Sequence, residues 1–132
     1  MEFRWNDGAK NFTNPAPIGV KMKSTNDITV ALSSSSQLRD GSAMIPVKVA
    51  LNSLGANGTT VPDVSATPKK LYECKSATTF EPFDIQLAAD KSGMLDGAGQ
   101  PITGNDAKPF PGTYSGAVQL LFESDLTSAC AL

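Results

Sequence analysis

Apolar residues recur at every second position in five stretches of the chain. A β-strand turns successive side chains to opposite faces, so this spacing is typical of strands with one face on a core. It predicts strands at residues 18–22, 28–32, 45–51, 83–88 and 114–122. Proline cannot donate a hydrogen bond to a sheet, so we expect Pro46 at the start of its strand or in an edge strand.

Turn-forming residues separate the predicted strands. Gly, Pro, Asn and Ser gather at residues 14–17, 33–36, 40–41 and 57–58, and residues 92–112 form a long loop rich in Gly and Pro. Two short helix candidates, 88–94 and 125–132, fall below the roughly 12 to 15 residues at which a helix is stable on its own. The pattern therefore predicts an all-β chain with an immunoglobulin-like Greek-key sandwich.

The length of 132 residues, with 40% hydrophobic residues, suits one domain with one core. We expect a single domain over residues 1–132, with 1–8 and 123–132 as candidate tails or expression remnants. No stretch reaches the 18 apolar residues of a membrane span, and residues 1–7 lack the layout of a signal peptide. An exported form would therefore have lost its leader.

The charge balance and the missing histidine exclude several function classes. Eleven Lys and Arg against thirteen Asp and Glu give a net charge of −2, so no strongly basic surface exists to bind nucleic acid. The sequence has no His, which is the commonest general base and metal ligand. These features favour a protein that is not an enzyme and that has no metal site and no cofactor.

Two weaker chemical alternatives remain open. A small β-fold hydrolase would draw a pair of carboxylates from a set scattered through polar segments: Glu73, Glu81, Asp84, Asp90 and Asp96. A sugar-binding groove would use aromatic side chains that core packing explains equally well: Trp5, Phe12, Tyr72 and Tyr114.

The two cysteines, Cys74 and Cys130, are too few for a structural zinc site. One disulfide between them is the economical interpretation, and it would imply an oxidising compartment. By the chain-entropy model such a bridge contributes about 4 kcal/mol to stability. The alternative is two separate buried thiols in a reducing compartment.

The segment Pro111–Phe122 is similar to part of a known protein family. Its sequence, PGTYSGAVQLLF, resembles the closing strand of chaperone–usher pilins, where a Gly-x-Tyr-x-Gly turn leads into alternating apolar residues. Lys10-x-Phe12, Thr25-Asn26 and Ile45–Val49 are similar to features of the alpha-fimbrial branch, the colonisation-factor antigen I type. The order and spacing run from about residue 8 to residue 122.

This resemblance implies an incomplete immunoglobulin-like domain that lacks its final strand. A neighbouring subunit, or a periplasmic chaperone, would supply that strand and insert alternate side chains into a groove. The matching groove wall here would be one face of the predicted last strand: Tyr114, Gly116, Val118, Leu120 and Phe122. The implied protein is a structural subunit of a fimbria on the bacterial surface that serves adhesion to host cells, with neighbouring subunits, a chaperone, an outer-membrane usher and a host receptor as partners.

Some features depart from the family. Its members carry an N-terminal donor segment of alternating apolar residues, which is not visible before Phe12, and many major subunits of this branch have no Cys. The leading alternative is a self-complete immunoglobulin-like module that binds carbohydrate or protein. In that alternative, residues 123–132 or the N-terminal residues complete the sheet.

Overall fold

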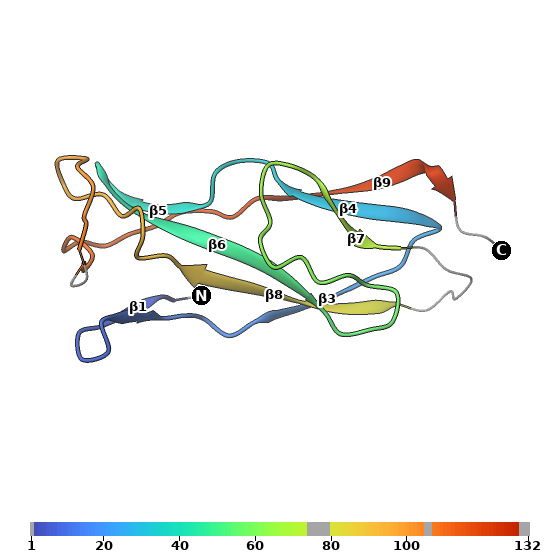
Figure 1. The fold of residues 1–132 in the computed structure, drawn as a ribbon, viewed down its shortest axis with the longest axis horizontal. Coiled ribbons are helices and arrows are strands. Elements are labelled where there is room, and N and C mark those ends of the chain that lie inside the picture. The colour runs from blue at the N-terminus through green and yellow to red at the C-terminus, as the bar shows by residue number, and fades with distance from the viewer. Residues whose placement is uncertain (1, 74–79, 105–106, 130–132) are drawn as a thin grey trace. The chain divides into compact units, whose positions relative to one another are not determined.

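A computed structural model describes residues 2–73, 80–104 and 107–129, in which all regular structure is β-strand (Figure 1). No helix occurs in these ranges, and so none that could cross a membrane. The nine strands are β1 Arg4–Asn6, β2 Asn11–Thr13, β3 Ile18–Met22, β4 Asn26–Leu32, β5 Gln37–Asp40, β6 Ala43–Ser53, β7 Lys69–Tyr72, β8 Glu81–Ala89 and β9 Leu120–Ala129.

The strands form three sheets. β1 pairs with β2 alone, a four-stranded sheet has the order β3-β8-β6-β5, and a three-stranded sheet has the order β7-β4-β9. The pairs β1–β2, β3–β8, β5–β6, β4–β7 and β4–β9 are antiparallel. These antiparallel sheets confirm the predicted all-β class and are consistent with an immunoglobulin-like sandwich.

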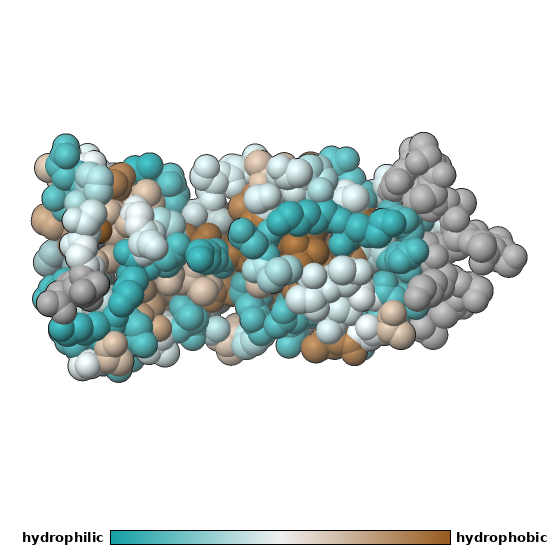
Figure 2. All heavy atoms as spheres, viewed as in Figure 1, coloured by the Kyte–Doolittle hydropathy of each residue, from teal (hydrophilic) through white to brown (hydrophobic). Residues whose placement is uncertain are grey.

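The chain divides into two compact units. Unit 1 contains Met1–Ala16, Ser36–Lys48 and Leu87–Val118, and unit 2 contains Pro17–Ser35, Val49–Gln86 and Gln119–Leu132. The long strands β6 and β8 contribute residues to both units. On the face of the molecule seen in Figure 2, hydrophilic residues lie among neutral and hydrophobic ones.

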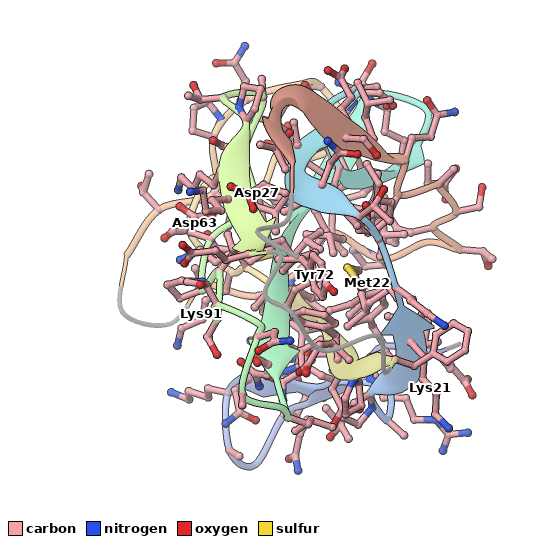
Figure 3. The ribbon with its side chains drawn as sticks, turned by 90° about the vertical axis from the view of Figure 1, so that its right-hand side faces the viewer. Lys21, Met22, Asp27, Asp63, Tyr72 and Lys91 are labelled. Atoms are coloured by element: carbon pink, nitrogen blue, oxygen red, sulfur yellow. The ribbon has the colours of Figure 1, made fainter. Side chains whose placement is uncertain are left out.

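The core of unit 2 follows from strand alternation. Val49 and Leu51 of β6 and Phe83 of β8 are almost fully buried, as is Val30 of β4. Figure 3 looks at the end of unit 2, where Met22 and Tyr72 point into the space between β7, β4 and β9 and the layer that holds β3 and β8. Burying these side chains is the main favourable term in forming the unit.

The core of unit 1 is smaller. Ile45 of β6, Met94 and Ala107 are buried together. Partly buried apolar residues surround them: Phe12, Leu38, Ala89, Ile102 and Tyr114. Residues 92–112 hold no regular strand in their described part, which agrees with the predicted loop, but Met44 and Leu95 exchange two backbone hydrogen bonds of 3.1 and 2.9 Å. The loop is therefore part of the packed unit.

Four of the five predicted strands are confirmed as β3, β4, β6 and β8. The fifth is displaced: residues 114–119 form only an isolated bridge between Ser115 and Arg39, and β9 begins at Leu120. Both short helix predictions are wrong in their described parts, because residues 88–89 end β8 and residues 125–129 belong to β9. Pro46 meets neither expectation, because it is the fourth residue of β6, and β6 lies between β8 and β5 in its sheet.

Candidate functional site

The free edge of β9 is the first element of the candidate site. β9 pairs with β4 along one side, with Leu32 opposite Leu120 and Val30 opposite Phe122. The order β7-β4-β9 makes β9 an edge strand, and no described strand pairs with its other side. An edge strand presents unpaired N–H and C=O groups that can accept a further strand.

The inner face of β9 is incompletely covered. Lys70 and Asp27 form a 3.2 Å ion pair on one face of the β7-β4-β9 sheet, so the opposite face, with Val30, is the inner one. Phe122 lies beside Val30 on this inner face. Val30 is 1% exposed, whereas Phe122 is 43% exposed. A large aromatic side chain turned to the core thus remains open to solvent on the side away from β4.

A second edge strand in unit 2 also has an inner face that is partly open to solvent. β3 is an end strand of the four-stranded sheet, with Ile18 opposite Ile85 and Val20 opposite Phe83. Phe83 is fully buried, so this is the inner face, yet Ile18 is 36% exposed. The inner face of β3 is therefore also uncovered at its edge.

The segment 57–65 covers the other edge of the β7-β4-β9 sheet and the part of β6 that extends beyond its partner β5. The segment 57–65 binds β7 through a 2.8 Å hydrogen bond from Thr59 N to Leu71 O. It then binds β6 through two bonds of 2.9 Å between Val61 and Leu51 and another of 2.9 Å from Val64 N to Val49 O. In unit 2 the outer side of β7 and this part of β6 are thus covered by the chain itself, while the outer sides of β3 and β9 have no partner strand in the described structure.

The residues predicted as a groove wall fall into two groups. Leu120 and Phe122 lie on the inner face of β9 in unit 2. Tyr114, Gly116 and Val118 precede β9 and belong to unit 1. Because β9 starts six residues later than predicted, they share no strand with the first two.

Gly116 and Tyr114 have structural roles in unit 1. A Cβ on Gly116 would lie 2.1 Å from the carbonyl oxygen of Gln37, so the position is a close approach of two backbones. The Tyr114 hydroxyl donates a hydrogen bond to the carbonyl of Phe110. Burial, and secondarily the negative charge of Asp40, raise the pKa of Tyr114 above its ordinary value of 10.0.

Two of the carboxylates considered for hydrolysis, Asp90 and Asp96, make local contacts. Asp96 accepts hydrogen bonds from the backbone N–H groups of Ala98 and Gln100, and Asp90 lies 3.7 Å from the Lys48 ammonium. Glu81 is buried, and its Oε2 has no hydrogen-bond partner. No group of three metal-binding side chains occurs in the residues that the structure describes.

The aromatic residues considered for sugar binding are packing residues. Trp5 and Phe12 meet edge to face across β1 and β2, with ring centroids 5.0 Å apart. Tyr72 is fully buried and cannot stack on a sugar. Cys74 and Cys130, predicted as a disulfide pair, lie outside the described residues.

Sequence reasoning did not assign Ile18 to the site. Alternation places it on the inner face of its strand, but only the sheet order shows that this strand is an edge.

The comparison with protein families finds that the model described as CS1 type fimbrial major subunit matches residues 1–123. The comparison with curated proteins finds no match.

Proposed function

Since the chain belongs to the family of CS1 type fimbrial major subunits, and is thus a structural subunit of a fimbria, we propose that a strand donated by another protein completes unit 2. In the fibre the donor is a neighbouring subunit, and before assembly it is a periplasmic chaperone that hands the subunit to an outer-membrane usher. The assembled fimbria stands on the bacterial cell surface and serves adhesion to host cells. The subunit itself is not an enzyme and needs no cofactor.

The exposure of Phe122 carries this proposal. An inward-facing Phe that is 43% exposed, beside a Val that is 1% exposed, supports a missing neighbour on the outer side of β9. A donated strand would pair with the free N–H and C=O groups of β9 and cover this ring with one of its alternate side chains. Ile18 at the edge of β3 supports the same conclusion from the other sheet.

The candidate groove is accordingly narrower than the sequence predicted. We assign its β9 wall to Leu120 and Phe122, and we add the inner face of β3 with Ile18. Val118 is half-buried in unit 1 and lies two residues before Leu120, so its place in the groove stays a prediction from the sequence.

The alternative of a self-complete binding module has less support. In that alternative, the N-terminal residues or residues 123–132 supply the last strand. The described N-terminal strands β1 and β2 pair only with each other. Residues 123–129 continue β9 along β4, with Asp125 opposite Asp27, and add no separate strand.

Amide hydrogen exchange of the monomeric chain and of assembled fibres tests strand donation. We expect the β9 amides that do not bond to β4 to exchange rapidly in the monomer and to become protected in the fibre. β7 is the matched control, because segment 57–65 already covers its outer edge and should keep it protected in both states. Equal protection of β9 in monomer and fibre would favour the self-complete module.

A further inference from the structure

A group of hydrogen bonds on Gln119 holds the start of β9 against the end of β4. The Ser33 backbone N–H donates a 3.0 Å hydrogen bond to the Gln119 carbonyl. The hydroxyls of Ser33 and Ser34 both donate to Oε1 of the Gln119 side chain, at 3.3 Å each. All three residues belong to unit 2, in which β9 runs beside β4 (Figure 1). We call Ser33, Ser34 and Gln119 the Gln119 cluster.

The apolar residues of β9 do not fix its register by themselves. Leu120, Leu121 and Phe122 follow one another, so apolar side chains occupy both faces of the strand. Leu121 and Phe122 are each 43% exposed, although they lie on opposite faces. A shift of one residue exchanges the two faces, and such a shift is opposed only weakly where both faces carry similar residues. Here it would turn Leu121 inward in place of Phe122.

Glu123 opposes this shift less than its charge suggests. In the observed register it stands opposite Thr29, on the outer face, and a shift of one residue would turn it inward. However, β9 is an edge strand, and even the inward-facing Phe122 is 43% exposed. A carboxylate turned inward at this open edge would therefore still reach water. Its full desolvation cost appears only when a donated strand covers the edge.

The segments on either side of this stretch do not fix the register either. After Asp125 the pairing with β4 is irregular, because Asp27 stands opposite Asp125 whereas Asn26 stands opposite Ala129. Residues 116–119, which lead into β9, are in no strand, so they can absorb a shift of one residue. The Gln119 cluster lies where the regular pairing begins.

We propose that Gln119 is a positioning residue for strand donation. The hydroxyls of Ser33 and Ser34 hold its side chain and thereby fix the register in which β9 turns Leu120 and Phe122 toward the donated strand. The inference rests on the proposed function. It adds that the groove wall is set before the donor arrives, by polar contacts on the outer face of the sheet.

An NMR contact, the NOE between the Phe122 ring and the Val30 methyl groups, reports the register in the monomeric full chain, because the two residues stand opposite each other in the observed register. Gln119→Met keeps the length of the side chain and removes its acceptor, so it should weaken this NOE several-fold. Gln119→Glu keeps an acceptor oxygen and should retain the NOE. Ser33→Ala combined with Ser34→Ala removes both hydroxyl donors, should also weaken the NOE, and decides alone if Gln119→Met does not fold. An unchanged NOE in these variants, or equal losses in the Met and Glu variants, would overturn the proposal.

A second change separates an effect on register from a general loss of stability. Leu121→Thr places a hydroxyl on the outer face in the observed register, whereas a shift of one residue would turn that hydroxyl inward at a cost. The change favours the observed register through the pattern of β9 alone, so adding it to Gln119→Met should restore the NOE. It would not repair a variant that is merely less stable. A double variant that folds without regaining the NOE would overturn the role of Gln119 in the register.

The rate of fibre dissociation connects the register to strand donation. In fixed denaturant, Gln119→Met fibres should release monomer several-fold faster than unaltered fibres, and added Leu121→Thr should reverse this. Equal release rates from Gln119→Met and unaltered fibres would overturn the role of Gln119 in donation. Failure of strand donation itself gives a different result, namely β9 amides that stay unprotected in fibres while the NOE of the monomer still responds to Gln119→Met.

Discussion

Truncating Phe122 to alanine removes the side chain on which the proposed strand donation depends. The ring is 43% exposed on the inner face of β9, and a donated strand would bury the exposed part. Phe122→Ala should therefore weaken the joint between subunits. The change acts on assembly because the lost contact exists only with the donor in place.

The magnitude follows from the exposed area. An aromatic side chain buries roughly 150–250 Å² when fully covered, so an exposed fraction of 43% leaves about 85 Å² for the donor to cover. At about 25 cal/mol per Å² this burial contributes about 2 kcal/mol to each joint. Losing it weakens the joint by roughly 30-fold.

The rate of fibre dissociation measures this loss, because changes within one interface appear mostly in the dissociation rate. Fibres are held at a fixed denaturant concentration, and the released monomer is followed with time. Phe122→Ala fibres should release monomer roughly 30-fold faster than unaltered fibres.

Leu121→Ala is the matched control. Leu121 is also 43% exposed and neighbours Phe122 on β9, but it lies opposite Ala31 and so faces the outer side of the sheet. Its truncation should change the dissociation rate by less than about threefold, because the donor does not reach the outer face. Equal rates for the two variants, or an unchanged rate for Phe122→Ala, would refute a groove beside β9.

Three further predictions concern stability in denaturant or heat. Gly116→Ala should destabilise the chain by about 1–3 kcal/mol, because its Cβ would strike the backbone of Gln37. Gly19→Ala should be neutral or slightly stabilising, because its Cβ would make only an ordinary contact, 3.9 Å from Asp84 Oδ1. Equal denaturation midpoints for the two variants would contradict this. The raised pKa of Tyr114 means that the folded state holds the phenolic proton more tightly, so stability should fall as pH rises above about 10. Tyr114→Phe should remove this loss of stability at alkaline pH. An unchanged dependence of stability on pH would contradict the assignment of the loss to the Tyr114 hydroxyl. Glu81→Met should stabilise by about 1–3 kcal/mol, because it removes a buried carboxyl oxygen without a partner, and a lowered melting temperature would show that the carboxyl group is paired.

The sequence predicted strands best where a sheet has one buried face. Alternating residues gave β3, β4, β6 and β8 close to their observed bounds, since each has a clear inner face. The sequence analysis missed β7, because Lys69-Lys70 followed by Leu71-Tyr72 shows no alternation of polar and apolar residues. That strand forms through its pairing with β4, which is distant in sequence, and with segment 57–65.

The predicted last strand shows why periodicity alone cannot locate a site. Residues 114–118 alternate as a strand would, but the close approach of Gly116 to the Gln37 backbone holds them on β5. Only from Leu120 does the chain pair with β4. Alternation identifies inner faces but carries no information on which strands are edges, so Ile18 became a site residue only once the sheet order was known.

Unit 2 has one side that its own chain covers and one side that is open, and this difference suggests how the fold serves assembly. Residues 57–65 cover β7 and the part of β6 beyond β5 with four short backbone hydrogen bonds. At the other edges, β3 and β9 keep unpaired backbone groups beside partly exposed Ile18 and Phe122. Such edges are a liability in a protein that works alone, because they pair with any available strand. Under the proposed strand donation, the same edges would make each subunit depend on its neighbour, and the edge left open on one subunit would become the joint with the next.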